Sequence, residues 1–357
     1  MDSPYTILST IIFFFSLFRV NKNFEIIFYL FLIILSSILI CNLNLSDLEG
    51  YFSYFQLIKL GEDLSSYRFE PFYYFTNKLF SFFSDFSFLR AFLIGFGLTI
   101  KLIFFRSFGK NIPLILLSYF ALQFYVDSYL LRLTFAICFI LIAIIFRFRS
   151  KNILSFIFLL LAINSHYSAI ALIPFLLIQN VYIPLYFIII PLIFIITFQV
   201  SDLTPFILEI IVKYIIPIVN LIGFSTTDAI SIYYENYYFG ESLGLLRGSL
   251  IIYALIFIVF KIINQNCLPE EKRCLNVIEN GMLFSLFMLI VFNNQPTLGD
   301  RLARYTLTFF PVGLGLIMSK ISSKSRKFYV PLISIVLLIA SFLIDQGPYE
   351  SIRNLIF

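Results

Sequence analysis

Six side chains that could take part in chemistry lie near the ends of long apolar segments. They are Arg90, Arg132, His166, Arg247, Arg301 and Arg304. A charge in or near hydrocarbon costs about 2.5–3.5 kcal/mol per group on insertion scales, so cations kept at one membrane depth suggest a function. Arginine presents planar donors that match phosphate oxygens two at a time. The pattern predicts a site for an anionic headgroup, such as phosphate or pyrophosphate.

The elements that must position these side chains are membrane helices. The chain has a mean hydropathy of +0.96, and 60% of its residues are hydrophobic. Only 13% are charged, against about 25% in a soluble domain. No soluble core of this length could bury so much apolar surface. We therefore expect one all-α, polytopic transmembrane domain over residues 1–357, without a cleavable signal peptide and with its four cysteines as free thiols.

Apolar runs divide the chain into about twelve expected helices, several of them shorter than the ~20 residues that cross a bilayer directly. The spans are 5–19, 23–42, 89–106, 111–126, 128–147, 152–166, 168–181, 182–200, 245–264, 275–293, 301–319 and 328–345.

Charge in the connections predicts the orientation. One side has short loops rich in basic residues and is therefore expected in the cytoplasm: Arg19, Lys22, Arg106, Lys110, Arg147, Arg149, Lys151, Lys261, Lys272, Arg273, Lys320, Lys324, Arg326 and Lys327. The other side carries the acidic residues Asp47, Glu49, Glu62, Asp63, Glu70, Asp85, Asp127, Asp202, Glu209, Asp228, Glu235, Glu241 and Asp300. Both termini and two large loops, 43–88 and 201–244, are then outside.

This alternation requires that segment 70–86 does not span the bilayer. Glu70-Pro71 is typical of a helix start, with proline in the first turn. Tyr73, Asn77, Ser81 and Ser84 then form a polar face at helical spacing, which predicts an interfacial amphipathic helix on the outer surface. Segment 203–222 has a similar pattern. The alternative for both is a tilted or re-entrant span.

Tyrosines with interspersed carboxylates mark both outer loops. The first loop contains Tyr51, Tyr54, Tyr67, Tyr73 and Tyr74, and the second contains Tyr237 within the polar stretch 231–240. Flat rings suit the faces of sugars, so these loops are candidates for carbohydrate binding. The alternative is an interfacial aromatic belt, which tyrosine must supply because the chain has no tryptophan.

Three short blocks carry the polar residues. In the first, Asp127 precedes Arg132, which lies about one turn inside its helix and binds phosphate or extends to the outer interface. In the second, His166 lies between two helices and is a general base, a phosphate ligand or a helix cap. In the third, Asp300, Arg301, Arg304 and Tyr305 are neighbours on one helix, and Asp300 either favours the helix start or pairs with Arg304.

The sequence lacks the nucleotide-binding motifs G-x-x-x-x-G-K-[ST] and G-x-G-x-x-G and the metalloprotease motif H-E-x-x-H. One histidine cannot build a histidine-rich metal centre. We expect no cofactor, no metal and no nucleic-acid partner.

The order of these blocks resembles the EpsG family and the related Wzy-type O-antigen polymerases. The resemblance rests on Glu70-Pro71, Leu131–Ala136, Ala162–Ile170 and Arg301–Tyr305, and it extends over about residues 45–320. Leu133 stands where the family often has glutamine.

The resemblance implies a metal-independent glycosyltransferase of the C-type membrane superfamily. Such an enzyme polymerises surface polysaccharide, including that of lipopolysaccharide, at the periplasmic face of the bacterial inner membrane. It moves a glycan from undecaprenyl pyrophosphate to another lipid-linked repeat unit, with membrane lipid and a chain-length regulator as further partners. The expected catalytic residues are Arg132, His166, Arg301, Arg304 and Glu70, and the expected substrate-binding residues are Arg90, Asp127, Arg247, Asp300, Tyr305 and Tyr237. The base is His166, Glu70 or Asp127.

Two other functions fit parts of the pattern. A polysaccharide or lipid-linked glycan flippase or other transporter should have paired repeats and polar residues at the bilayer midplane. The midplanes here are nearly free of them. A membrane O-acyltransferase also uses histidine and arginine, but it would receive its acyl donor from the cytoplasm, whereas His166 is predicted outside.

Overall fold

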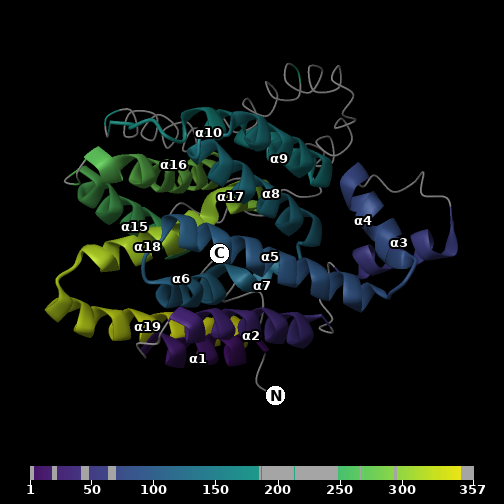
Figure 1. Ribbon diagram of the computed structural model, residues 1–357, viewed down its shortest axis with the longest axis horizontal. Helices are drawn as coiled ribbons and strands as arrows, with labels where there is room; N and C mark the ends of the chain where they lie inside the picture. Colours follow the sequence, from purple (N-terminus) through teal and green to yellow (C-terminus); the bar gives the residue numbers. More distant parts are fainter. Residues whose placement is uncertain are drawn as a thin grey trace. The chain divides into compact units, whose positions relative to one another are not determined.

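The described part of the chain is helical throughout (Figure 1). The computed structural model describes residues 4–17, 22–41, 48–62, 70–184, 248–265, 269–292 and 296–346 and the single positions 186, 213 and 267. The chain divides into two compact units. Unit 1 contains residues 1–170 and 311–349, and unit 2 contains residues 171–310 and 350–357. Arg247, Tyr237 and nearly all of segment 203–222 lie outside the described residues.

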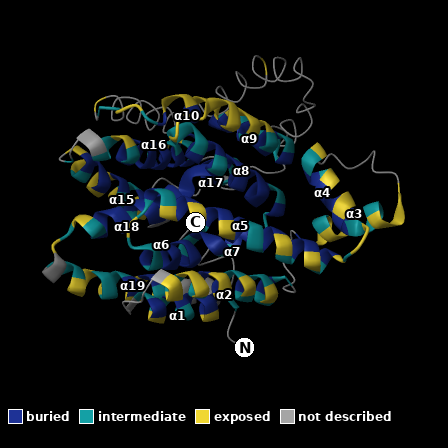
Figure 2. Ribbon diagram, viewed as in Figure 1, coloured by how far each residue is buried: buried dark blue, intermediate teal, exposed yellow. Residues whose placement is uncertain are grey.

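Unit 1 is built around α8, which is buried along most of its length (Figure 2). Its helices are α1 (Pro4–Leu17), α2 (Lys22–Ile40), α3 (Leu48–Leu60), α4 (Pro71–Ser81), α5 (Phe86–Phe108), α6 (Ile112–Tyr119), the π-helical turn η1 (Phe120–Phe124), α7 (Tyr125–Asp127), α8 (Leu131–Phe148), α9 (Asn152–Ser165), most of α18 (Phe309–Lys320), and α19 (Ser323–Gln346). Helices α5 and α9 pack against α8, and α1 packs against α2, α6 and α19.

A tight turn between α8 and α9 positions the predicted site residues. Ser150 adopts a left-handed backbone conformation (φ 60°) in this turn, so the chain reverses within three residues. Helices α8 and α9 then pack side by side along their length. The first turn of α8 and the end of α9 therefore lie at the same open end of a helical hairpin. These are the positions of Arg132 and His166, so their proximity is a consequence of the hairpin.

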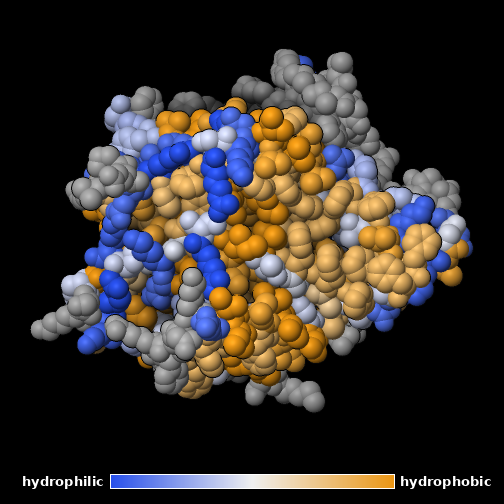
Figure 3. Space-filling model, viewed as in Figure 1, coloured by the Kyte–Doolittle hydropathy of each residue, from blue (hydrophilic) through white to orange (hydrophobic). Residues whose placement is uncertain are grey.

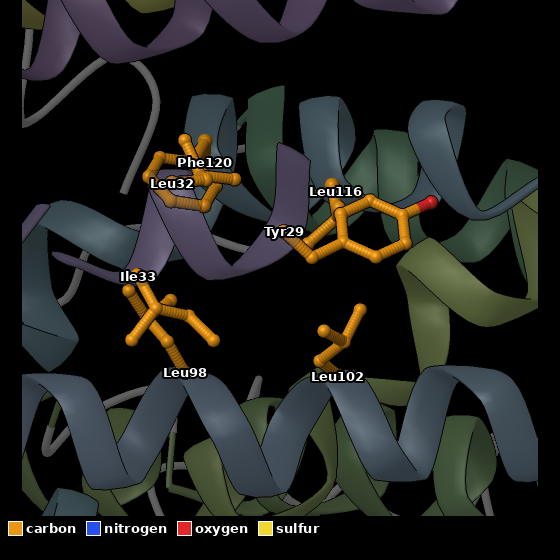
Figure 4. A pocket seen from close by; sticks show the side chains of 7 residues that line it. All are labelled: Tyr29, Leu32, Ile33, Leu98, Leu102, Leu116 and Phe120. Carbon is orange, nitrogen blue, oxygen red and sulfur yellow. The ribbon is translucent and has the colours of Figure 1, made fainter. Parts of the chain in front are cut away.

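A small apolar pocket lies between α2, α5, α6 and η1 of unit 1 (Figure 4). Its lining is Tyr29, Leu32, Ile33, Leu98, Leu102, Leu116 and Phe120. The one polar atom among these side chains, the Tyr29 hydroxyl, donates a hydrogen bond to Glu25. The pocket offers no other polar side-chain group to a substrate, so we do not assign chemistry to it.

Unit 2 contains the end of the 3₁₀ turn η2 (Tyr167–Leu172), together with α10 (Ile173–Ile178), α15 (Gly248–Gln265), α16 (Pro269–Val291) and α17 (Pro296–Leu307). Helix α16 packs against α10, α15 and α17. Gly281 of α16 allows the close approach of Phe309, the first residue of α18, because a Cβ atom at position 281 would lie only 2.5 Å from the ring of Phe309. A larger residue would displace the aromatic ring.

The apolar helices indicate a multi-pass membrane protein. Four described helices are long and apolar enough to cross a bilayer, and α17 with α18 would make a fifth if the bent pair is one span. Others are too short to cross directly: α9 has 14 residues, or about 21 Å of helix against ~30 Å of hydrocarbon. The twelve predicted spans and the single-domain organisation remain predictions.

The orientation predicted from loop charge can be tested with single cysteines in a background that lacks the four native ones. Glu62→Cys and Arg149→Cys replace exposed residues at predicted outer and cytoplasmic positions. In cells with a permeabilised outer membrane, an impermeant maleimide should label position 62 and leave position 149 unlabelled, because short basic loops stay in the cytoplasm. The opposite labelling pattern would reverse the orientation.

Candidate functional site

Three segments of unit 1 bring Glu70, Arg132 and His166 together. The Arg132 guanidinium donates from an NH1 nitrogen to Glu70 Oε2 at 2.9 Å. The His166 Nδ1 atom lies 3.8 Å from Glu70 Oε1, and the main-chain N–H of Tyr167 donates to the same oxygen at 3.4 Å. The Glu70 carboxylate is 5% exposed, whereas Arg132 is 22% and His166 is 17% exposed. The Arg132 and His166 side chains are therefore partly open to an approaching ligand, whereas the carboxylate is buried.

Local sequence explains why the carboxylate has this position. Glu70 is the residue before α4 and has an extended backbone (φ −62°, ψ 145°), while Pro71 occupies the first turn, as predicted. The Glu70 side chain makes no capping bond to its own helix. It is directed instead to Arg132, in the first turn of α8. This ion pair joins residues 62 positions apart in the sequence.

The contacts of His166 fix its tautomer. The residue ends α9 with an extended backbone, as expected for a helix junction. The main-chain N–H of Ser168 donates to His166 Nδ1 at 3.4 Å, and the Ser168 hydroxyl lies 3.0 Å from the same nitrogen. A main-chain amide only donates, so we assign Nδ1 as the acceptor and place the proton of the neutral ring on Nε2. In this tautomer, His166 presents a hydrogen-bond donor at its Nε2 edge, and its predicted role as a base remains untested.

Tyrosines of the first predicted outer loop form one wall beside the ion pair. Tyr54 and Tyr73 stack with their ring centroids 6.3 Å apart, and Tyr51 meets Tyr73 edge-on at 5.9 Å. The Arg132 guanidinium lies 5.8 Å from the Tyr51 ring centroid. Burial raises the pKa of Tyr73 above its usual range, so that ring stays neutral. Because Tyr54 and Tyr73 are buried, they support the site, and only Tyr51 of these three is open enough to contact a sugar.

Arg90 occupies a different place in unit 1. It lies in the first turns of α5, is 2% exposed, and donates to the main-chain oxygen of Cys41 at 3.2 Å. Cys41 follows the last residue of α2. The positive charge therefore lies at the carbonyl end of a helix, which is favourable for the helix dipole. This contact supplies a structural role for Arg90, and its predicted role in substrate binding remains untested.

Asp127 is bound by Lys101, which is not among the site residues predicted from the sequence. Lys101 Nζ donates to Asp127 Oδ2 at 2.6 Å and to the Tyr119 hydroxyl at 2.8 Å, and Tyr119 donates to the same carboxylate oxygen at 2.9 Å. All three side chains are buried. The apolar helices therefore contain more buried charge than the sequence analysis predicts. The sequence feature that could have predicted this pair is Lys101 itself, because a lysine within an apolar segment needs a partner. The predicted roles of Asp127, in substrate binding and as a candidate base, remain untested.

Helix α17 of unit 2 carries the third predicted block. Arg304 donates from Nε to Asp300 Oδ2 at 2.8 Å, which is the pairing considered as the alternative for Asp300. Arg304 and Tyr305 are buried, and Arg301 is half-buried. The predicted helical neighbourhood of these residues is confirmed. Their predicted roles at the site remain untested.

Unit 2 contains a second buried polar cluster. Lys261 pairs with Glu279, and Asn264 donates to the same carboxylate. Asn280 donates from Nδ2 to the main-chain oxygens of Ile178, Gln179 and Val181, at 2.8–3.1 Å. Lys261, expected in a cytoplasmic connection, lies inside α15 and is buried. The cluster secures the turn after α10, whose carbonyl groups would otherwise be buried without donors.

Ligand sets for a metal ion require several His, Cys, Asp or Glu side chains in one place. In the ranges that the structure describes, no three of them gather in this way.

The model of the EpsG family matches residues 25–351. No curated protein and no solved structure matches the chain.

Proposed function

Because this chain belongs to the EpsG family, whose members are linked to exopolysaccharide synthesis, we propose that it is a lipid-linked glycan polymerase. It would transfer a growing glycan from a polyprenyl pyrophosphate, of the undecaprenyl type in bacteria, to the non-reducing sugar of another lipid-linked repeat unit. The observation that supports this most is the cluster of Glu70, Arg132 and His166. It combines a carboxylate with two donors for an anion at the end of a helical hairpin.

In the proposed reaction, a hydroxyl oxygen of the acceptor sugar attacks the anomeric carbon of the donor sugar. The bond from that carbon to the pyrophosphate oxygen breaks, and its electron pair leaves with the lipid pyrophosphate. A guanidinium has five N–H donors, so Arg132 can bind a phosphate oxygen as well as Glu70. A fixed positive charge at this place stabilises the leaving group as the bond breaks.

The proton of the attacking hydroxyl needs an acceptor. Glu70 is a carboxylate beside Arg132 and His166, whereas the Nδ1 atom of His166 already accepts from Ser168. We assign Glu70 as the general base and His166 as a donor to the pyrophosphate through Nε2. Arg301 and Arg304 are proposed as further anion-binding residues, and Tyr51 as a contact for the sugar.

A transporter is the second candidate, because buried charges within helices are typical of transport proteins. The pairs Lys101–Asp127 and Lys261–Glu279 are such charges. Their side chains are at most 7% exposed, and each charge has its partner. They therefore resemble structural pairs more than the lining of a water-filled path.

Surface-polysaccharide gels from a strain without this gene distinguish the candidates. For a polymerase, the polymer ladder should disappear while a single repeat unit remains on its lipid acceptor, because export and attachment do not need polymerisation. Loss of the single unit as well would indicate a transporter. An unchanged ladder would contradict both proposals.

A further inference from the structure

Helix α4 has its apolar face directed away from the protein. The exposed positions Pro71, Phe75, Lys78, Leu79 and Phe82 are spaced so that they share one side of the helix. Three of them are large and apolar: Phe75 is 59%, Leu79 is 46% and Phe82 is 77% exposed. We name Phe75, Leu79 and Phe82, with the following Phe83, the outer face of α4.

Three polar side chains of α4 lie on the opposite side. Tyr73, Thr76 and Asn77 are buried, together with Phe80. The sequence had predicted a polar face containing Tyr73 and Asn77 on the outer surface of the membrane. The structure instead turns these two residues toward the protein, beside Glu70 and the tyrosine wall. Large apolar side chains gathered on one exposed face indicate apolar surroundings, such as lipid or a protein partner.

The outer face adjoins a helix that can cross the membrane. The Phe83 ring of this face lies 5.4 Å from the buried Phe80 ring, which in turn lies 6.0 Å from Phe88 and 4.9 Å from Phe92. Phe88 and Phe92 are exposed residues of α5, which is a candidate span of 23 residues. Apolar surface over α5 runs on to the region of α3 and α4 in Figure 3. Phe88 is close to the first residue of that span, so α4 contacts α5 near this end of the span.

Lys78 helps to identify what covers this face. It is exposed in the middle of the outer side of α4, between Phe75 and Phe82. A second copy of the chain packed there would have to desolvate this ammonium group. At a bilayer interface, lysine extends its charge to the headgroups while its methylene groups remain among apolar neighbours. Exposed phenylalanines around one lysine are therefore better suited to lipid than to protein.

We propose that the outer face of α4 binds membrane phospholipid at the bilayer interface, with its aromatic side chains among the upper acyl segments. Helix α4 is then a wall between lipid on one side and Glu70 on the other. A substrate whose tail stays in the bilayer would meet the site at the end of α4 that Glu70 precedes. This last consequence depends on the proposed function, whereas the lipid contact does not.

The absence of tryptophan from the chain gives a direct test. Phe75→Trp and Phe82→Trp each introduce a single fluorophore into an exposed position. The proteins are reconstituted into vesicles of phospholipids brominated either near the headgroup or deep in the acyl chain. We expect strong quenching by bromine, greater with the shallow label than with the deep label.

Two matched variants calibrate the measurement. Thr99→Trp replaces an exposed residue in the middle of α5 and should be quenched more by the deep label. Phe55→Trp replaces a buried residue of α3 and should be quenched little by either label. If one of the two α4 variants fails to insert, Phe83→Trp supplies a third exposed position.

Two results would overturn the proposal. Protection from brominated lipid with strong quenching by aqueous acrylamide would place the outer face in water. Protection from both quenchers would mean that protein, such as a second copy of the chain, covers it. Neither readout uses catalysis, so a failed polymerase assay leaves this test unaffected.

Discussion

Arg132→Ala should reduce polymer formation by roughly 100- to 1,000-fold, the usual effect of removing one fixed donor from a developing negative charge. The proposed reaction releases a lipid pyrophosphate, and Arg132 is the half-buried cation beside the proposed base. Turnover is measured in vitro with purified protein and lipid-linked repeat units, with the product ladder as the readout. Arg301→Ala is expected to cause a similar loss, as the second predicted anion-binding arginine.

Arg132→Lys separates charge from geometry. Lysine keeps a cation against the buried Glu70, so this variant should insert and fold even if Arg132→Ala is damaged by an unpaired carboxylate. A point charge cannot reproduce the planar pair of donors, so little activity should return. The matched control is Arg149→Ala, in the exposed turn at the other end of α8, which should keep its ladder. A full ladder from Arg132→Ala would remove this arginine from the site and favour its alternative role as an interfacial side chain.

Glu70→Gln should reduce turnover by about 100- to 10,000-fold, the range associated with general acid–base catalysis. Glutamine keeps the size and an acceptor oxygen for Arg132, but it cannot take the proton of the acceptor hydroxyl. His166→Gln should retain substantial activity, because glutamine still presents an N–H donor where His166 presents Nε2–H. His166→Ala should lose most activity, since it removes that donor.

The comparison between these variants decides which group is the base. Equal and near-complete loss in His166→Gln and His166→Ala, with activity retained in Glu70→Gln, would make His166 the base and contradict the tautomer assigned from Ser168. Near-normal activity in both histidine variants would leave His166 as a helix cap. Gel filtration of each purified variant serves as the folding control, because loss of the Glu70 charge also removes an ion pair.

Several features followed from the sequence because they depend on local chemistry. The helix start at Pro71, the position of Arg132 in the first turn of α8 and the junction at His166 are confirmed. Each is set by neighbouring residues: a proline after an extended residue, an arginine at the edge of an apolar run, and a polar break between two apolar segments. Family membership followed in the same way, from short blocks in a fixed order, and the EpsG match confirms it.

Other features depended on contacts between distant residues. Periodicity revealed that α4 has two faces, but only its packing against α5 and α9 decided which one is turned outward. Asp127 looked equivalent to Glu70 as a carboxylate near an arginine. The structure distinguishes them, because Lys101 from another helix binds Asp127 while Arg132 binds Glu70.

The sequence by itself determined that this is an apolar helical protein with cations at the ends of its helices. Hydrophobicity and the cost of charge in lipid act on each residue separately, so they can be read without knowing its partners. The tertiary structure alone decided which carboxylate each cation holds and which side of α4 meets its surroundings. The Arg132–Glu70 ion pair joins residues 62 positions apart, and the polar face of α4 is buried against other helices. Both contacts form only in the folded chain, so their energies cannot be deduced from the local sequence.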